Sequence, residues 1–335
     1  MTRRVAVLGA GSWGTALAVH LARVGHEVRL WARDARTVDE IRDRRANAVY
    51  LPDVHLPEGV VPTSALAEAL VDTDFVVCAV PSHGIRSVMR AAAPHLLPGA
   101  ILVSATKGLE ADSMLRMSEV LAHETQHAHP VAVLSGPSFA LEVARQMPTA
   151  VVVACHDGIA LERVQAEFKG PYFRLYGTDD VVGVELCGAL KNVIAIAAGV
   201  VEGAGLGHNA LAALITRGLA EMTRLTAAAG GRRETSAGLS GLGDLVLTCT
   251  GSLSRNRHVG MELARGRALQ DIVSGMKMVA EGVRTTGAAL ALGTRYGVEL
   301  PIATQVSAVI DGRIDVRSGL EALMLRRQRS ETETT

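Results

Sequence analysis

Two polar residues, Lys191 and Asn192, stand side by side in an otherwise small and apolar stretch, GALKNVIAIAAG, at 188–199. This stretch predicts a buried helix, in which a lysine is desolvated at a cost in free energy. Desolvation lowers the pKa of a lysine toward neutrality, so its amine can take a proton from an alcohol as a hydride leaves, and return it in the reverse reaction. Asn192 would orient the lysine or bind substrate. The alternative is a lysine whose stem lies in the core while its ammonium reaches solvent.

A second group of polar residues lies in GLSGLGDLVLTCTGSLSRNR, at 238–257. Asp244 stands between a glycine and an apolar run, and Thr248, Ser254, Arg255 and Asn256 follow. A guanidinium beside an amide and hydroxyls is typical of an anion site, because arginine binds phosphate through two hydrogen bonds. Asp244 would pair with Lys191 or accept a bond from a substrate hydroxyl. A capping aspartate and a solvated arginine are the alternative, but so many polar groups around glycines favour a substrate site.

The segment GAGSWG, at 9–14, follows a β-rich run and opens a helical one. In that context the pattern G-x-G-x-x-G indicates a dinucleotide site. Gly9 permits the tight turn, Gly11 lets the pyrophosphate approach the backbone, and Gly14 lets the helix pack closely on the strand. The N–H groups at the helix start then meet the phosphates. The context disfavours the alternative, a glycine turn without a ligand.

The end of the second β-rich run indicates which nucleotide binds. A site specific for NAD has an acidic residue there, which holds the ribose hydroxyls. In this chain Arg33 comes first and Asp34 follows. Arg33 suits a 2′-phosphate, so NADP is an expected cofactor, while Asp34 keeps NAD compatible. The alternative is that Arg33 is only solvated.

Three loops that follow later β-rich runs are small, polar or glycine-bearing, as expected where ligands meet the carboxyl ends of parallel strands. They are Pro81–His83, Ala105–Gly108 and Ser135–Ser138. Lys107 is the fixed positive charge among them. It would reach a substrate phosphate or carbonyl, or it is an ordinary loop lysine; the residues alone leave both interpretations open.

One motif points elsewhere. HETQH, at 123–127, matches the H-E-x-x-H pattern of zinc proteases. No downstream ligand motif accompanies it, and it ends a predicted helix just before a strand, on the side of the sheet away from the ligand edge. We therefore interpret it as a chance match on a solvated helix end, and we expect no metal site.

The elements that must position these residues change character along the chain. Strand and helix patterns alternate to about residue 178, and helical periodicity continues alone to about Leu325. The fold class is therefore α/β, a Rossmann-like, mainly parallel sheet followed by an all-α C-terminal domain. We expect a dinucleotide-binding domain at 1–178, an all-helical substrate-binding domain at 179–328 and a frayed tail at 329–335. The expected strands are Arg4–Leu8, Glu27–Trp31, Phe75–Val80, Ile101–Ser104, Val131–Ser135, Thr149–Ala154 and Tyr172–Tyr176. The expected helices include Gly14–Val24, Thr63–Val71, Ser113–Thr125, Ile159–Phe168, Asp180–Val201, Asn209–Ala229, Arg284–Tyr296 and Thr304–Ile310.

Composition narrows the function classes. The 335 residues carry no formal net charge and only 3% aromatic side chains, which argues against nucleic acid as a partner. The four cysteines are scattered without a Cys-x-x-Cys pair, as expected of free thiols in a reducing cytoplasm. The start of the chain imitates a signal peptide, but the glycines of GAGSWG interrupt it. No uninterrupted apolar run reaches the roughly 20 residues of a membrane span.

Taken together, these motifs resemble the bacterial NAD(P)-dependent glycerol-3-phosphate dehydrogenase family. The matching pieces are GAGSWGTALA, LWARD, AVPSH, ATKGLE, SGPSFA, GALKNVIAIAAG, ALITRGLAEM, GLGDLVLTCT and SRNR, in the family's order from residue 9 to residue 257, with a weaker VAEGVRTT at 279–286. The resemblance covers nearly the whole chain. Each motif is shared more widely, whereas the ordered set is specific. Ser138 stands where some relatives have threonine and keeps the hydroxyl.

The resemblance implies a reversible reduction of dihydroxyacetone phosphate to sn-glycerol 3-phosphate, which supplies glycerophospholipid synthesis. It also implies a nucleotide domain followed by a helical substrate domain. Lys191 resembles the family's proton acceptor. The implied substrate contacts are Lys107, Gly136, Ser138, Asp244, Ser254, Arg255 and Asn256, and the implied cofactor contacts are Ser12, Trp13, Arg33, Lys107, Ala140, Arg255, Val279 and Glu281.

Two other functions remain open at this point. A β-hydroxyacid dehydrogenase or ketopantoate reductase shares both halves and a catalytic lysine, but acts on a carboxylate rather than a phosphate ester. A nucleotide-sensing protein would bind NADPH without turnover, and would leave the Lys-Asn pair and the Arg-Asn pair without a use. The Ala- and Gly-rich helices of the second half offer flat apolar faces, which suggests a homodimer.

Overall fold

The computed structural model describes residues 2–276, 278–328 and 330. The chain divides into two compact units, which we name by their contents. The sheet unit comprises Met1–Lys107 and Leu115–Val181, and the helical unit comprises Gly108–Met114 and Val182–Thr335. Of the expected tail at 329–335, all residues but Ser330 lie outside the described part.

An eight-stranded sheet forms the centre of the described sheet unit, in the order β3-β2-β1-β4-β5-β6-β7-β8. Neighbouring strands are parallel except at β6–β7, which is antiparallel. The carboxyl ends of β1 to β6 therefore meet at one edge. The strands are β1 (Arg4–Leu8), β2 (Glu27–Trp31), β3 (Val60–Thr63), β4 (Phe75–Cys78), β5 (Ile101–Ser104), β6 (Val131–Ser135), β7 (Thr149–Ala154) and β8 (Phe173–Thr178).

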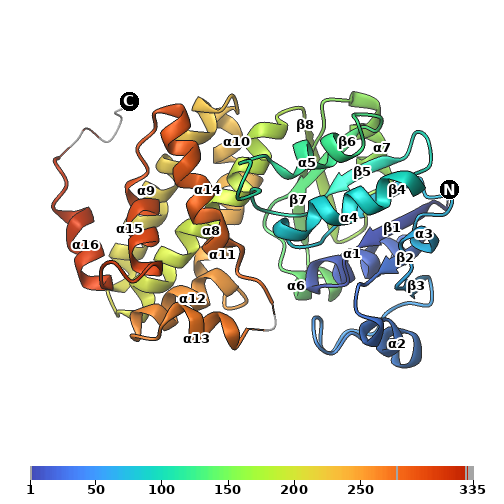
Figure 1. Ribbon diagram of the computed structural model, residues 1–335, viewed down its shortest axis with the longest axis horizontal. Helices are drawn as coiled ribbons and strands as arrows, with labels where there is room; N and C mark the ends of the chain where they lie inside the picture. Colours follow the sequence, from blue (N-terminus) through green and yellow to red (C-terminus); the bar gives the residue numbers. More distant parts are fainter. Residues whose placement is uncertain (1, 277, 329, 331–335) are drawn as a thin grey trace. The chain divides into compact units, whose positions relative to one another are not determined.

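Helices cover both faces of this sheet because both faces are apolar (Figure 1). Val5 and Val7 of β1 join a core with α1, α2, α6 and α7, while Ala6 and Leu8 join a second core with α3, α4 and α5. This alternation is the two-residue period of a strand. The helices are α1 (Ser12–Arg23), α2 (Ala35–Arg44), α3 (Leu66–Ala69), α4 (Ile85–Ala92), α5 (Met117–Glu124), α6 (Ala140–Ala144) and α7 (Gly158–Phe168).

The described helical unit is built around α8 (Val181–Gly203). By length and composition this helix could cross a membrane, but 94% of its apolar window is buried among its neighbours, so it is a core helix. The other helices are α9 (Gly207–Ala228), α10 (Arg233–Ala237), α11 (Asp244–Thr250), α12 (Arg255–Ala264), α13 (Leu269–Ser274), α14 (Glu281–Tyr296), α15 (Pro301–Ile310) and α16 (Val316–Met324), with a π-helical turn at Leu239–Gly243. The expected fold class, an α/β sheet domain followed by an all-α region, is confirmed.

Glycines let α12 and α14 approach α8 at backbone distance, and a glycine of α9 packs against a side chain of α8. A Cβ at Gly260 of α12 would lie 1.9 Å from the Ile196 carbonyl oxygen, and one at Gly199 would lie 1.9 Å from the Arg257 carbonyl oxygen. A Cβ at Gly282 of α14 would lie 2.5 Å from the Asn192 carbonyl oxygen, and one at Gly218 of α9 would lie 2.5 Å from Ile194. No side chain fits where α12 and α14 cross α8, because a Cβ there would collide with backbone atoms, so Gly260 and Gly282 set the distances between these helices.

The helix α15 obtains its N-cap from another helix. Its own N-cap residue, Leu300, makes no side-chain cap bond. Instead the buried carboxylate of Glu221, on α9, accepts hydrogen bonds from the N–H groups of Ile302 (2.9 Å) and Ala303 (3.0 Å). The docking of α9 therefore satisfies backbone groups that the first turn of a helix leaves unpaired.

The structure corrects the type of one predicted element and the ends of several others. The stretch Thr63–Val71 was expected to be a helix, but Val60–Thr63 forms the edge strand β3, and the helix after it, α3, covers only Leu66–Ala69. Pro62 obscured this strand, because proline is depleted from strands. It is tolerated here because an edge strand leaves part of its backbone unpaired. β4 also ends at Cys78, two residues earlier than predicted.

The close crossing of α8 and α12 predicts that Gly260→Ala destabilises the helical unit. Overpacking of a filled core costs about 1–3 kcal/mol, and more where the backbone must move. Gly287→Ala on α14 is the matched control, because a Cβ there meets nothing within 4 Å and alanine is favoured over glycine in a helix by roughly 0.5–1 kcal/mol. In thermal melts G260A should unfold below the wild type and G287A at or above it. Equal melting temperatures for the two variants would contradict the crossing.

Candidate functional site

The glycine loop between β1 and α1 has the geometry of a phosphate cradle. Gly9 has a φ of +114°, which favours glycine. A Cβ at Gly14 would lie 1.9 Å from the Gly9 carbonyl oxygen, so the helix must begin directly against the strand. Gly11 is the N-cap of α1 and makes no side-chain cap bond, and space is open at its Cα. The N–H groups of the first turn of α1 therefore have no intrahelical partner, and the open space beside Gly11 leaves room for a phosphate to accept from them.

Ser12 and Trp13, two implied cofactor contacts, open the same helix. The Ser12 hydroxyl donates to the Tyr50 carbonyl oxygen over 2.5 Å. The Trp13 ring is half-buried against the core of the sheet unit, and its Nε1 is buried without a hydrogen-bond partner among the described residues. A buried donor without a partner carries a desolvation cost that a bound acceptor would offset.

Arg33 and Asp34 both follow β2, but their side chains have different surroundings. The Asp34 carboxylate accepts a hydrogen bond from the Arg36 N–H over 3.0 Å and caps α2. Arg33 is exposed. The acidic residue on which NAD compatibility was based is thus also a helix cap, whereas the arginine lies on the surface.

Lys107, Gly136 and Ser138 lie together in the sheet unit at the carboxyl ends of β5 and β6. Lys107 Nζ donates to the Gly136 carbonyl oxygen over 3.1 Å, and the Ser138 hydroxyl donates to the same oxygen over 2.9 Å. Gly136 has a φ of +131° and packs on Val151. Thr106 anchors the neighbouring loop, because its hydroxyl lies within hydrogen-bond distance of the Cys78 and Val80 carbonyl oxygens. Lys107 is therefore an ordered part of this edge.

In the helical unit, Lys191 is buried with a carboxylate partner. Its Nζ donates to Asp244 Oδ1 over 2.5 Å and to the Thr248 hydroxyl over 2.8 Å. Thr248 in turn donates to the Asp244 main-chain carbonyl oxygen over 2.6 Å, so its hydroxyl oxygen is turned to accept from the lysine. The side chain of Lys191 is 7% exposed and that of Asp244 is 1% exposed. Lys191 does not reach solvent as the alternative supposed; it forms a buried ion pair.

Local sequence explains how Asp244 arrives there. A π-helical turn, Leu239–Gly243, precedes it, and the Gly243 N–H bonds the Gly238 carbonyl oxygen over 3.1 Å. A Cβ at Gly241 would lie 2.0 Å from the Ser236 carbonyl oxygen, so this wide turn requires glycine. Turns of this kind are frequent at functional sites.

Asn192 and Asn256 join three helices of the helical unit. Asn256 Nδ2 donates to Asn192 Oδ1 over 2.9 Å, and Asn256 Oδ1 accepts from the Gly282 N–H over 2.9 Å. Both asparagines are buried. They fix α8, α12 and the start of α14 against one another, a role that the sequence did not indicate.

The remaining predicted residues of the helical unit lie around the start of α12 and α14. The Ser254 hydroxyl caps α12 by accepting from the Arg257 N–H over 3.3 Å. Arg255, the next residue, is exposed, and Glu281 interacts electrostatically with it. Val279 is half-buried just before α14, and in the sheet unit half-buried Ala140 opens α6.

The zinc-protease pattern is not a metal site. The helix α5 ends at Glu124, and Gln126 and His127 have φ values of 51° and 59°, so the two histidines are not on one helix face. Glu124 pairs with Arg90 and Arg86, which lower its pKa to about 2 although burial opposes the shift. Within the described ranges, no group of histidine, cysteine and acidic side chains is placed to hold a metal ion. The four cysteines, all described, are buried thiols that form no disulfide with one another.

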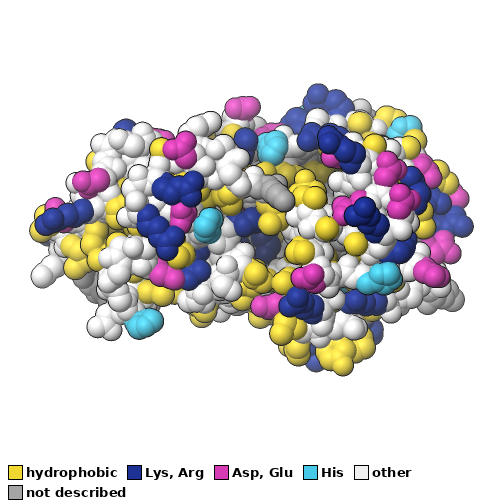
Figure 2. All heavy atoms as spheres, turned by 90° about the horizontal axis from the view of Figure 1, so that it is seen from below, with side chains coloured by type: hydrophobic (Ala, Val, Ile, Leu, Met, Phe, Trp, Pro, Cys, Tyr) yellow, Lys and Arg dark blue, Asp and Glu magenta, His cyan; other side chains and the backbone are white. Residues whose placement is uncertain are grey.

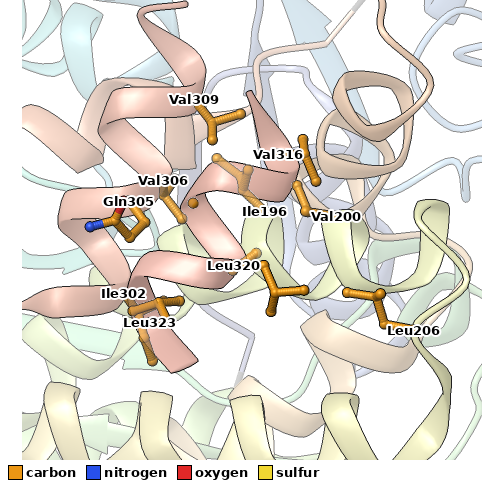
Figure 3. Close-up of a pocket in the computed structure, with 12 residues that line it drawn as sticks. Ile196, Val200, Leu206, Ile302, Gln305, Val306, Val309, Val316, Leu320 and Leu323 are labelled. Atoms are coloured by element: carbon orange, nitrogen blue, oxygen red, sulfur yellow. The ribbon is translucent and has the colours of Figure 1, made fainter. Parts of the chain in front are cut away.

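Other surfaces and hollows offer less chemistry. A cavity of about 60 Å³ lies among α8, α15 and α16, and Figure 3 shows aliphatic side chains around it, with Gln305 at its side. A hollow this apolar holds no groups for a phosphate ester. Figure 2 shows acidic and basic side chains interspersed on the face that it draws, with no single basic surface.

The comparisons with known proteins agree over the length of the chain. The family described as "NAD-dependent glycerol-3-phosphate dehydrogenase N-terminus" matches residues 4–160, and the corresponding C-terminus family matches residues 180–321. A "Glycerol-3-phosphate dehydrogenase [NAD(P)+]" of Koribacter versatilis is 52% identical over 327 residues, 96% of this chain and 97% of the relative. One of Geobacter sulfurreducens is 51% identical over 333 residues, 99% of each chain. A crystal structure of the Coxiella burnetii glycerol-3-phosphate dehydrogenase is 41% identical, with a TM-score of 0.93 over 97% of this chain and 99% of that one. The chain belongs to the NAD-dependent glycerol-3-phosphate dehydrogenase family.

Proposed function

We propose that this protein is a glycerol-3-phosphate dehydrogenase [NAD(P)+], which reversibly reduces dihydroxyacetone phosphate to sn-glycerol 3-phosphate and so supplies glycerophospholipid synthesis. The observation that carries the proposal is the buried Lys191–Asp244–Thr248 group in a chain of this family. We further propose a cytoplasmic homodimer. The cofactor fits the glycine loop, where space is open at Gly11 and where, among the described residues, the buried Trp13 Nε1 has no hydrogen-bond partner. NADPH or NADH supplies the hydride.

Lys191 is the proposed proton donor and acceptor. Reduction of a ketone adds a hydride to carbon and needs a proton for the oxygen, and an ammonium held in a fixed position provides that proton. Asp244 offsets the desolvation of the ammonium, and Thr248 limits its rotation. In the reverse direction the neutral amine accepts the proton of the alcohol. Proton transfer by a positioned side chain contributes roughly 10²- to 10⁴-fold to a rate.

Arg255 and Asn256 are the proposed phosphate contacts, with Ser254 ordering the turn that presents them. Arg255 is the first residue of α12, where backbone N–H groups also favour an anion. Asn256 already bonds Asn192 and Gly282, so it is held in place for the contact. Asn192, Asp244 and Thr248 complete the proposed substrate contacts of this unit, and Lys107, Gly136 and Ser138 provide those of the sheet unit.

The proposed cofactor contacts are Gly9, Gly11, Ser12, Trp13, Gly14, Arg33, Lys107, Ala140, Arg255, Val279 and Glu281. Arg33 is the group among them that separates the two coenzymes, since a guanidinium at the ribose suits a 2′-phosphate. Asp34 caps α2 and accepts from a backbone N–H. These placements support NADP as a coenzyme alongside NAD.

Purified protein should oxidise NADPH and NADH with dihydroxyacetone phosphate, and much more slowly with unphosphorylated dihydroxyacetone. The loss of absorbance at the nicotinamide band measures both rates. Turnover of ketopantoate instead would move the protein to a carboxylate-reducing function, and bound NADPH without any turnover would make it a sensor.

Lys191→Met should lower kcat by about 10²- to 10⁴-fold, the usual contribution of general acid–base catalysis. Removing one partner of a buried ion pair also costs about 3–5 kcal/mol, so the single variant is destabilised. The double variant K191M/D244N removes the unpaired charge and serves as the folded control. Steady-state kinetics and circular dichroism on both variants test the role; a folded K191M/D244N enzyme with wild-type kcat would disprove it.

Arg255→Ala should raise KM for dihydroxyacetone phosphate about 10- to 100-fold, because a hydrogen bond to a charged group contributes roughly 1.5–3 kcal/mol. Reduction of unphosphorylated dihydroxyacetone should hardly change. The matched control is Arg257→Ala on the same helix, which should hardly change KM, because the Arg257 guanidinium is bound by the carboxylate of Glu202 rather than offered to the substrate phosphate. Equal losses with both substrates would indicate that Arg255 supports the cofactor or the fold.

A further inference from the structure

A segment after α2 lies against the glycine loop of the sheet unit. This segment, Arg45–Leu56, we call the strap. Its base is held by Arg45, whose guanidinium donates to the Leu56 and Val60 carbonyl oxygens over 3.2 and 2.9 Å. Leu51, Val54 and Leu56 are buried in the same core as α1. The strap is therefore an ordered element with its own packing.

The side chain of Asn47, which lies on the strap, donates two hydrogen bonds to residues more than 30 positions earlier in the sequence. Its Nδ2 donates to the Ala10 carbonyl oxygen over 2.9 Å and to the Thr15 hydroxyl over 2.9 Å. An amide nitrogen has two hydrogens, so both are used. Ala10 is the middle residue of the first G-x-G, and Thr15 lies in the first turns of α1. The Ser12 hydroxyl, which donates to the Tyr50 carbonyl oxygen, adds a third link between loop and strap.

The placement of Asn47 is costly for stability alone. The residue is fully buried, and its Oδ1 has no hydrogen-bond partner among the described residues. A buried acceptor without a partner is unfavourable. The two donor bonds are thus what an asparagine provides here; one ends on the glycine loop, at Ala10, and the other on the first turn of α1, at Thr15.

The Ala10 contact fixes the direction of a neighbouring N–H group. A peptide bond is planar and trans, so the C=O of Ala10 and the N–H of Gly11 point in opposite directions. Holding the carbonyl toward the strap therefore turns the Gly11 N–H away from it. Gly11 is the residue at which a dinucleotide pyrophosphate approaches the backbone. The Thr15 contact adds a second point, which fixes the start of α1 relative to the same turn.

We propose that Asn47 is a positioning residue of the dinucleotide site: it orients the Ala10–Gly11 peptide and the first turn of α1 for the cofactor pyrophosphate. The inference rests on the proposed binding of NADPH and NADH. Because the pyrophosphate is common to both coenzymes, the loss of Asn47 weakens both by the same factor. A change at Arg33 would separate them.

The test is Asn47→Ser, whose shorter side chain does not reach the Ala10 carbonyl. Dissociation constants for NADPH and NADH, measured by the change in nicotinamide fluorescence, should both rise about 5- to 10-fold, which corresponds to the net contribution of one hydrogen bond. The value of kcat at saturating coenzyme and KM for dihydroxyacetone phosphate should stay within about twofold, and melting temperature is measured in parallel. Val49→Ala, an exposed position on the same strap, is the matched control and should change neither dissociation constant.

A second variant covers the case in which N47S fails to fold. Thr15→Val keeps the shape of the side chain and removes only one of the two acceptors of the Asn47 amide, so both coenzymes should weaken by a smaller, equal factor. Unchanged dissociation constants in N47S or T15V would overturn the proposal, as would a loss confined to NADPH. If N47S melts at a lower temperature and binds coenzyme and substrate more weakly by the same factor, Asn47 stabilises the fold and does not position the dinucleotide site, and the proposal fails.

This test is separate from that of the proposed function. If the wild type binds both coenzymes but does not reduce dihydroxyacetone phosphate, the proposed reaction fails while the role of Asn47 is still measurable by fluorescence. If the wild type is active and N47S binds both coenzymes normally, only the role of Asn47 fails.

Discussion

Contact between backbones is the constraint on which the helical unit depends. The helix α8 is too apolar to face water, and its neighbours approach so closely that Gly260 and Gly282 leave no room for a Cβ. Because the backbones are in direct contact at these crossings, a shift of either helix toward the other would make backbone atoms collide. Lys191 and Asn192 project from the helix that is held in this way. The precision that acid–base chemistry requires is thus supplied by residues without side chains.

Electrostatics then helps to explain why the Lys191–Asp244 ion pair is present inside this apolar structure. Burying two charges costs several kcal/mol per ion, and a buried pair is often no more stabilising than apolar residues of the same volume. The Lys191–Asp244 pair, with Thr248 as a third member, is therefore poor evidence of selection for stability. A proton held between fixed partners in a dry interior is useful for chemistry, and the cost is met by the surrounding apolar core.

Sequence patterns predicted the fold class, seven of the eight described strands and the long helices, because strand and helix periods and the spacing of glycines are local signals. These patterns failed where a short strand contained a proline and where contacts joined residues far apart in the chain. The edge strand β3 was missed because Pro62 masks a strand of four residues. The pairing of Lys191 with Asp244 was among the predicted alternatives, but the link from Asn256 through Asn192 to Gly282, and the contact of Asn47 with Ala10, join residues far apart in the chain. The spacing of residues in the sequence carries no information on such contacts. HETQH shows the opposite error: the motif matches in sequence, but α5 ends at Glu124, so the two histidines do not share a helix face.

The cap that Glu221 provides for α15 has a consequence for proton binding. Burial raises the pKa of this carboxyl to about 7 from 4.5, although the Ala303 and Ile302 N–H groups favour its charged form. Between these two values the folded chain holds a proton that the unfolded chain has released. Folding in that range is accompanied by proton uptake, and the stability that Glu221 contributes falls as pH rises toward 7. The contact between α9 and α15 at Glu221 therefore depends on the pH of the solution.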